Sequence, residues 1–322
     1  MPAPMPAPKS RALVIVNLGT PSAPTAEAVR RYLREFLTDK RVVQIPHFIW
    51  KPLLDWVILP RRSPAVAEKY AEIWMPEGSP LLAYGLRLAK AMDNALDGWQ
   101  VRTAMRYGKP ALAKVVQALH DEGHRDITVL PLYPQYSTTT TGSVEDAVAA
   151  LQQRFADTRL QLIRDYHQHP AWAAAIAGRI RQHWAQHGRG EKLVFSYHGI
   201  PERLVRAGDP YAAQCEASTA AIAAALDIPR EEILLTYQSR FGRERWLQPY
   251  TLPTLEQLGR DGTRTLDVVC PGFAVDCLET LEEITEQNAE AFRAAGGTAL
   301  RYIPCLNDSP AHVDALAALL PR

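Results

Sequence analysis

The sequence has little cysteine and no paired cysteines. Its 322 residues include four, with no C-x-x-C spacing between any two of them: Cys215, Cys270, Cys277 and Cys305. Scattered cysteines of this kind are typical of a reducing compartment, and they carry no signature of a disulfide framework or a zinc ribbon. We therefore expect no structural metal.

An excess of one charge and a long apolar run are also missing. The chain has 36 Lys and Arg against 35 Asp and Glu, a formal net charge of +1, so no global basic field is present to bind nucleic acid. It has no run of about 18 apolar residues, and residues 1–9 are too rich in proline for the apolar helix of a signal peptide. We expect a cytoplasmic protein that does not bind nucleic acid, with a disordered tail over residues 1–10.

The usual nucleotide-binding and serine-hydrolase motifs are absent as well. No G-x-G-x-x-G follows the first predicted strand, and neither a Walker A lysine motif nor a G-x-S-x-G elbow occurs. The segment N-L-G-T-P at 17–21 holds a single glycine, and it is interpreted either as a strand-to-helix turn or as a contact with a flat ligand. The sequence thus predicts no bound nucleotide.

Apolar segments alternate with helix-period segments along the whole chain. The length suits about two domains, and 47% hydrophobic with 22% charged residues is typical of a chain that buries a core. The alternation predicts an α/β fold of two similar Rossmann-like lobes, 11–170 and 171–322, each a doubly wound parallel sheet. The predicted strands are 12–17, 101–106, 127–132, 160–163, 193–197, 233–236, 266–270 and 299–303.

Four residues give local signals for helix ends. Ser63 and Ser79 each precede a proline, which predicts an N-cap followed by proline at the first helical position. Gly123 and Gly296 are each predicted to close a helix.

One histidine stands at the tip of a predicted strand. His198 ends an apolar run and is followed by Gly199 and Pro201, at the strand end where open parallel sheets place their ligands. Its imidazole can act as a base or a metal ligand near neutral pH, or it can be a hydrogen-bonded structural histidine. The pairs at 167 and 169 and at 183 and 187 are interpreted as surface histidines.

A row of carboxylates follows the last predicted strand but one. Asp276 precedes a helix on which Glu279 and Glu283, four residues apart, share a face. Such a row is either a solvated helix start or a path for protons and hard cations, in which repulsion and desolvation raise one pKa. Together with His198 it suits a divalent cation with nitrogen and oxygen ligands, or proton abstraction from a weakly acidic N–H.

Residues 45–62 form an unusually apolar segment, which we call the lip. Its large side chains crowd between two prolines, with Lys51, Arg61 and Arg62 nearby. The segment is too short to span a membrane, but it could grip an apolar ligand, touch a membrane interface weakly and reversibly, or pack in the core. Its apolar members include Phe48, Ile49, Trp50, Leu53, Leu54 and Trp56.

Five segments together resemble the ferrochelatase family in its Gram-negative bacterial form. Each motif is weak alone, but the five occur in the family's order and spacing, and the resemblance runs from about residue 11 to the end. They are N-L-G-T-P at 17–21, Y-P-Q-Y-S at 133–137, F-S-Y-H-G-I-P at 195–201, Y-Q-S-R-F-G at 237–242 and D-C-L-E-T-L-E-E at 276–283.

The resemblance implies a chelatase-like fold and a reaction. Two Rossmann-like lobes would hold protoporphyrin IX between them, and ferrous iron, a substrate, would be inserted to give protohaem and two protons without a nucleotide. His198 and Glu279 look like the family's catalytic pair and metal-handling residues, with Asp276 and Glu283 as a conduit. Other positions that match the cleft or the lip are implied to bind substrate: Arg106, Tyr107, Tyr133, Tyr197, Trp246, Trp50 and Leu53.

The chain also departs from the family in places. Some members continue the carboxylate row where this chain has Gln287, and close relatives have proline where it has Arg245. The four cysteines do not match the family's iron–sulfur form, so we expect no cluster. Two alternatives stay open: a cobalt or nickel chelatase acting on another tetrapyrrole, and a tetrapyrrole or metal carrier without turnover.

Overall fold

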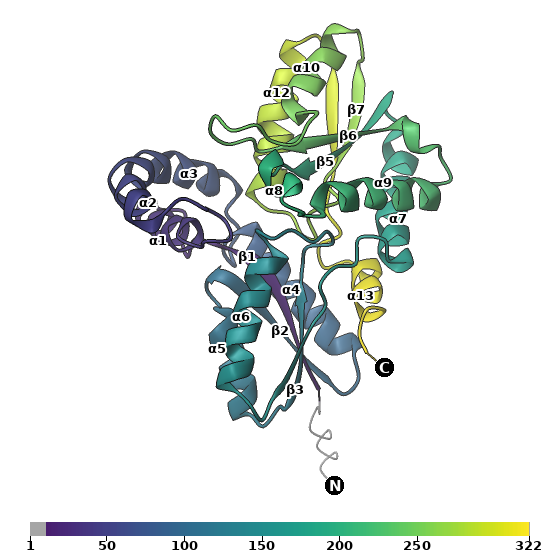
Figure 1. Ribbon diagram of the computed structural model, residues 1–322. Helices are drawn as coiled ribbons and strands as arrows, with labels where there is room; N and C mark the ends of the chain where they lie inside the picture. Colours follow the sequence, from purple (N-terminus) through teal and green to yellow (C-terminus); the bar gives the residue numbers. More distant parts are fainter. Residues whose placement is uncertain (1–10, 322) are drawn as a thin grey trace.

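Two parallel sheets form the framework of the molecule. The computed structural model describes residues 11–321, so the expected disordered tail at 1–10 lies outside the described residues. Each sheet has four strands, and the sheets lie in two lobes, one above the other in Figure 1. This confirms the predicted α/β class.

The first sheet has the strand order β2-β1-β3-β4, and all its pairings are parallel. β1 lies in the middle, and most of its RALVIVNLGT sequence is buried, as a strand covered on both faces requires. The strands are β1 (Arg11–Thr20), β2 (Trp99–Gly108), β3 (Asp126–Pro131) and β4 (Arg159–Leu162).

The second sheet repeats this arrangement with the order β6-β5-β7-β8. Its register pairs His198 at the end of β5 with Gln238 at the end of β6. The strands are β5 (Lys192–His198), β6 (Ile233–Gln238), β7 (Thr265–Val269) and β8 (Ala299–Ile303), so all eight predicted strands are present to within three residues.

Helices cover both sheets. The first lobe carries α1 (Ala26–Leu37), α4 (Pro80–Ala95), α5 (Leu112–Asp121) and α6 (Thr141–Arg154). The second carries α7 (Pro170–His187), α8 (Glu202–Arg206), α9 (Tyr211–Leu226), η2 (Arg230–Glu232), α10 (Thr251–Arg260), α11 (Leu278–Leu281), the π-helical turn η3 (Glu283–Asn288) and α12 (Ala289–Ala294). The last helix, α13 (Pro310–Ala317), packs against α4 and α7, so the chain ends against the first lobe (Figure 1).

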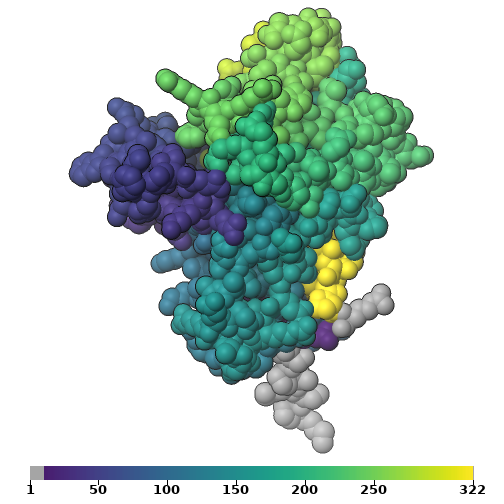
Figure 2. Space-filling view, in the orientation of Figure 1, coloured from purple at the N-terminus to yellow at the C-terminus, as the bar shows by residue number. Residues whose placement is uncertain are grey.

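The lip is helical from His47 onward and continues into a longer helix. It comprises α2 (His47–Leu53), the π-helical turn η1 (Leu54–Ile58) and the start of α3 (Leu59–Ile73). Figure 2 shows this segment, in dark purple and blue, protruding from the side of the molecule next to the second lobe. No helix within residues 11–321 is long and apolar enough to cross a membrane.

The helix-end predictions are confirmed at three of four positions. The Ser79 hydroxyl accepts a hydrogen bond from the Leu82 amide at the start of α4. Gly123 and Gly296 follow α5 and α12 with φ of 95° and 108°, which suits glycine. The prediction for Ser63 is wrong, because α3 already begins at Leu59 and Ser63 is buried inside it.

The two lobes share a core and a polar seam. One buried cluster contains Leu13 and Ile15 of β1 together with Phe195 of β5. The loop after β3 docks on the second lobe, where the Asp209 carboxylate accepts hydrogen bonds from Ser137 (2.9 Å) and from the hydroxyl and amide of Thr138. The carboxyl ends of the strands of both sheets therefore converge, which positions the loops that carry the candidate residues.

Candidate active site

His198 has one ring nitrogen, Nε2, that is not engaged by the hydrogen bond to the Gly199 carbonyl. Its Nδ1 lies 2.7 Å from the carbonyl oxygen of Gly199. A carbonyl only accepts hydrogen bonds, so Nδ1 carries the proton of the neutral imidazole and Nε2 keeps its lone pair. The partly exposed ring lies 6.4 Å from Trp246 and 6.5 Å from Phe273, centroid to centroid. Two aromatic rings thus flank an imidazole whose Nε2 can bind a proton or a metal ion.

The turn after His198 is tightly packed and favours glycine at position 199. A Cβ on Gly199 would lie 3.0 Å from the carbonyl oxygen of Gln238 and 3.2 Å from the ring of Trp246. The Gly199 amide donates to that same carbonyl at 2.8 Å. The close approach holds the tip of β5 against β6 and Trp246, and with it the backbone of His198.

Glu279 lies where the second lobe meets helices of the first. It is in α11 and half-buried, close to the Cys277 thiol, whose pKa is raised by burial and further by the charge of Glu279. Burial raises the pKa of Tyr70 in α3 and of Tyr32 in α1, and the nearby Glu279 charge raises each further. Glu279 therefore lies within electrostatic range of two buried phenols of the first lobe.

Glu283 is held in a nearly enclosed position beside His198. Its carboxylate accepts from the amide (2.9 Å) and hydroxyl (2.5 Å) of Ser239 and from Nε2 of Gln238 (3.3 Å). Burial raises the pKa of Glu283, the bonds from Ser239 and the nearby His198 lower it, and Glu279 raises it. The structure thus brings Glu279, Glu283 and His198 into one electrostatic neighbourhood.

Asp276 does not belong to that row. It is fully buried, and its carboxylate accepts from Tyr302 (2.5 Å), Thr280 (3.1 Å) and Asn307 (2.6 Å), which ties β8 and the loop after it to the start of α11. A carboxylate with its lone pairs engaged in this way is a structural bridge. The contacts of Asp276 thus favour a structural role, and its conduit role stays a prediction.

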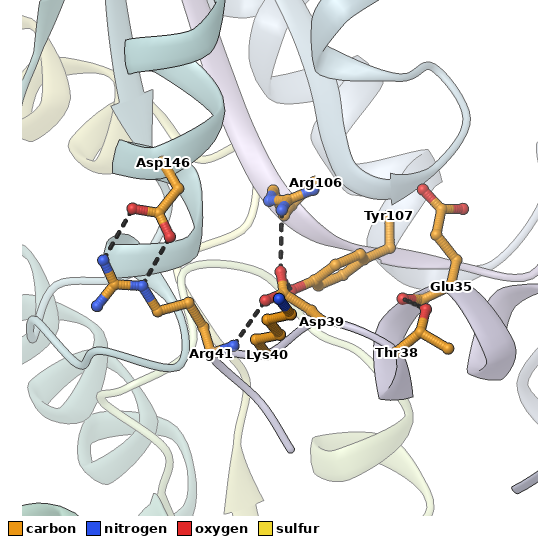
Figure 3. A pocket seen from close by; sticks show the side chains of 8 residues that line it. All are labelled: Glu35, Thr38, Asp39, Lys40, Arg41, Arg106, Tyr107 and Asp146. Carbon is orange, nitrogen blue, oxygen red and sulfur yellow. Dashed lines mark hydrogen bonds and ion pairs between the residues drawn. The ribbon is translucent and has the colours of Figure 1, made fainter. Parts of the chain in front are cut away.

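Arg106 and Tyr107 line a polar pocket of the first lobe, of about 390 Å³ (Figure 3). Asp39 accepts from the Arg106 guanidinium at 2.9 Å and from the Tyr107 hydroxyl at 2.7 Å, while Arg41 binds Asp146 through two hydrogen bonds. Hydrogen bonds from Ser143 and Tyr107 and the charge of Arg106 outweigh burial and lower the pKa of Asp39. All of the lining residues belong to the first lobe: Glu35, Thr38, Asp39, Lys40, Arg41, Arg106, Tyr107 and Asp146.

The aromatic residues expected to bind substrate divide into two groups. Trp246 is half-buried next to His198, and the Tyr133 hydroxyl is buried without a hydrogen-bond partner among the described residues, close to Arg106 and Tyr107. Tyr197, in contrast, is fully buried, with its hydroxyl 2.9 Å from that of Thr219 in α9. Tyr197 belongs to the core, because alternation along β5 turns its side chain away from that of His198.

The lip is part core and part surface. Trp50 is 8% exposed and donates from Nε1 to the carbonyl of Leu37 at 2.6 Å, which favours a core role, while its substrate contact stays a prediction. Leu53 is 42% exposed, and Phe48 and Trp56 are 79% and 82% exposed. The exposed side of the lip is therefore apolar, while its inner side packs on α1 and α3.

Sequence reasoning missed Gln238 and Asp39. Gln238 stands in the Y-Q-S-R-F-G motif, and its place at a strand end beside His198 was the available signal. Asp39 carried no motif signal. Within residues 11–321, no group of three or more His, Cys, Asp or Glu is placed to hold a metal ion.

The two lobes, each built on a four-stranded parallel sheet, form a chelatase fold. His198 ends strand β5, and Glu279 and Glu283 lie in helices that follow β7 in the second lobe. A solved structure titled SirB from Bacillus subtilis with Fe3+ is similar over 96% of this chain and 93% of that one, with a TM-score of 0.55 and 13% identity, which bears on the fold alone. The ferrochelatase family model matches residues 10–322. Ferrochelatase of Xylella fastidiosa (strain M12) is 58% identical over 97% of each chain. That of Vibrio cholerae serotype O1 is 50% identical over 97% of this chain and 98% of the relative. The chain belongs to the ferrochelatase family, and it is a metal chelatase of haem biosynthesis.

Proposed function

We propose that His198 and Glu279 are the catalytic pair with which this chain inserts ferrous iron into protoporphyrin IX. The observation that carries the assignment is the hydrogen bond from His198 Nδ1 to the Gly199 carbonyl, because it leaves the Nε2 lone pair free. In the reaction two pyrrole N–H bonds break, two protons leave, and the iron gains four bonds to nitrogen. A neutral imidazole and a carboxylate can each accept such a proton or ligate incoming Fe²⁺.

The walls of the site supply binding energy. A flat porphyrin keeps its nitrogen lone pairs in the ring plane, so the macrocycle must bend before a metal can approach from one face. Trp246 and Tyr133 offer aromatic surface for such a grip. Binding energy from contacts of this kind is used to distort the substrate.

Glu283 extends the path that Glu279 begins. The two carboxylates are four residues apart and electrostatically linked, and the pKa of Glu283 is raised by burial. A group of this kind can take up a proton and pass it on. We assign Glu279 and Glu283, without Asp276, to the removal of protons or the delivery of iron.

The test is an anaerobic assay with ferrous iron and protoporphyrin IX that follows the loss of porphyrin fluorescence. The wild-type protein should show turnover, and Glu279→Gln should lower kcat about 10²-fold or more, the scale of lost acid–base catalysis. His198→Ala should bind porphyrin and lose insertion, whereas exposed His187→Ala, the matched control, should behave as wild type. Near wild-type turnover in His198→Ala would overturn the assignment of the pair.

The two alternative functions are not favoured. Family membership supports iron and protoporphyrin over cobalt or nickel and another tetrapyrrole. A carrier without turnover has no need for an available imidazole nitrogen beside linked carboxylates. Insertion of cobalt or nickel in preference to iron, or tight porphyrin binding with no insertion by the wild type, would reinstate one of them.

We expect neither an iron–sulfur cluster nor a nucleotide. The four cysteines are free and buried, and burial raises the pKa of each thiol, which disfavours the thiolate that ligates iron. Protein purified anaerobically should therefore contain no acid-labile sulfide. Stoichiometric sulfide would contradict this expectation.

The exposed side of the lip suits weak contact with a membrane surface as well as porphyrin. Phe48 and Trp56 project apolar rings, and Lys51 and Arg61 are exposed cations on the same segment. A few apolar side chains and cations bind anionic lipid reversibly, short of a stable anchor. We place the protein in the cytoplasm, in part at the inner membrane.

A further inference from the structure

We infer that Gln238 is a positioning residue. It holds the segment that carries Glu279 and Glu283 in place relative to His198 at the end of β5. This inference rests on the proposed roles of His198, Glu279 and Glu283. It adds a residue that acts through these three groups and not directly on the substrate. The argument comes from the contacts of one buried side chain.

The backbone of Gln238 fixes the turn that follows His198. Gln238 is the register partner of His198 in the parallel pairing of β5 with β6. Its carbonyl accepts from the Gly199 amide at 2.8 Å, directly after His198. A shift of Gln238 along β6 would therefore move the turn that fixes the His198 ring.

The side chain of Gln238 binds both Glu279 and Glu283. Its Nε2 donates to the carbonyl oxygen of Glu279 at 2.7 Å and to the carboxylate of Glu283 at 3.3 Å. These two residues lie where α11 gives way to the π-helical turn η3. Turns of this type change the regular pairing of backbone carbonyls and are frequent at functional sites. One amide thus fixes both the backbone of Glu279 and the side chain of Glu283.

The orientation of the amide is itself determined. Oε1 accepts from the Ser196 hydroxyl at 2.8 Å and from the Cys270 thiol at 3.6 Å, while Nε2 faces only acceptors. Gln238 is 3% exposed, so water does not substitute for these partners. A buried amide with both ends satisfied has one stable orientation, which makes it a rigid spacer between β5 and the α11–η3 segment.

Gln238→Met tests the inference, because it keeps the length of the side chain and removes its hydrogen bonds. With iron and porphyrin in the anaerobic assay, kcat per folded molecule should fall about tenfold or more, and KM for porphyrin should change less than about twofold, since only the alignment of reacting groups is lost. The matched control is Gln152→Met, which removes a bridging amide in α6 that binds the carbonyls of Phe155 and Thr158. It should leave kcat and KM unchanged.

Exchanging the amide and the carboxylate between Gln238 and Glu283 gives a measurement that distinguishes positioning from a merely structural role. Gln238→Glu alone places a carboxylate against that of Glu283 and should lower kcat more than Gln238→Met does. Combining it with Glu283→Gln removes the carboxylate repulsion and allows a hydrogen bond in the reverse sense, so the double variant should lose less kcat than the product of the two single losses, with Glu283→Gln measured alone as the reference. Single losses that multiply without coupling would overturn the inference.

Two further outcomes separate the inference from the proposed function. If Gln238→Met does not fold, Ser196→Ala removes the hydroxyl that orients the amide and should lower kcat a few-fold at constant KM. Wild-type kcat in whichever of these two variants folds would overturn the positioning role while leaving the function intact. An inactive wild-type protein would instead overturn the function.

Discussion

The ammonium group of Lys69 in α3 lies 2.9 Å from the carboxylate of Glu282, which follows α11, so an ion pair joins the two lobes beside the candidate site. The Glu282 side chain is 8% exposed and that of Lys69 is 37% exposed. Removing the lysine leaves a buried carboxylate without its counter-charge. Lys69→Met should therefore lower the free energy of unfolding by about 1–3 kcal/mol.

Chemical denaturation measures this effect, and an exposed ion pair serves as the control. Arg31→Met breaks the surface pair with Glu27 on α1 and should cost about 0–0.5 kcal/mol. Equal effects of the two substitutions would show that the Lys69 pair is no more than a surface contact.

Trp50 and Trp56 provide a matched pair within the lip. Trp50→Phe deletes the donor to the Leu37 carbonyl in a buried site and should cost about 1–3 kcal/mol of unfolding free energy. Trp56→Phe alters an exposed ring and should stay within about 0.5 kcal/mol of wild type. Thermal or urea unfolding of the two variants checks the assignment, which fails if Trp56→Phe is the more destabilised.

The exposed side of the lip makes a separate prediction. The double variant Phe48→Ala with Trp56→Ala removes the two most exposed aromatic rings of the lip, so it should reduce co-sedimentation with anionic liposomes. Neutral liposomes are the control for the cationic contribution. Unchanged sedimentation with a raised KM for porphyrin would instead assign the exposed lip to the substrate.

Asp276 is expected to act on stability and not on turnover. Asp276→Asn turns an amide donor toward hydroxyl and amide groups that now donate to the carboxylate, and it should cost about 1–3 kcal/mol. The kcat per folded molecule should stay within about threefold of wild type. Exposed Asp314→Asn is the control. A large loss of kcat at unchanged stability would return Asp276 to the conduit.

His312 makes folding sensitive to acid. Burial lowers its pKa to about 4, while its Nδ1 donates to the Asn307 carbonyl at 2.6 Å. The His312 imidazole takes up a proton near pH 6.5 in the unfolded chain and only near pH 4 in the folded chain. The neutral, buried imidazole therefore makes its full contribution to stability above pH 6.5. Below that pH it is lost by about 1.4 kcal/mol per pH unit, down to about pH 4.

Unfolding free energies measured from pH 7 to pH 4.5 check this slope against His312→Gln. Glutamine retains a donor for the Asn307 carbonyl but does not titrate, so the variant should show a flatter profile. Parallel profiles for the two proteins would assign the acid sensitivity to other groups.

The sequence predicts the strands well because their signal is local. A strand buried on both faces, such as β1, needs a continuous apolar run, and that run is visible without any tertiary information. His198 was found for the same reason, since a histidine that ends such a run marks the carboxyl edge of a sheet.

The surroundings of Asp276 and Trp50 could not be predicted because they depend on distant residues. The partners that engage Asp276 include Tyr302 and Asn307, 26 and 31 residues further along the chain. Trp50 and Trp56 are alike in sequence, and only the packing of α1 and α3 makes one a core residue. Ser63 looks like a helix cap, but a helix that already runs through it leaves no backbone donors to cap.

The position of α13 bears on how the protein is made. This helix, at residues Pro310–Ala317, packs against α4 of the first lobe, and its Val313 and Leu316 belong to the same buried cluster as Leu13 of β1. On the ribosome, residues 11–170 emerge long before α13 does, so the apolar surface that α13 covers stays open during most of synthesis. Folding of the first lobe is therefore completed only at the end of synthesis. A stop codon shortly before residue 310 would expose the part of the core around Leu13, nearly 300 residues earlier in the chain.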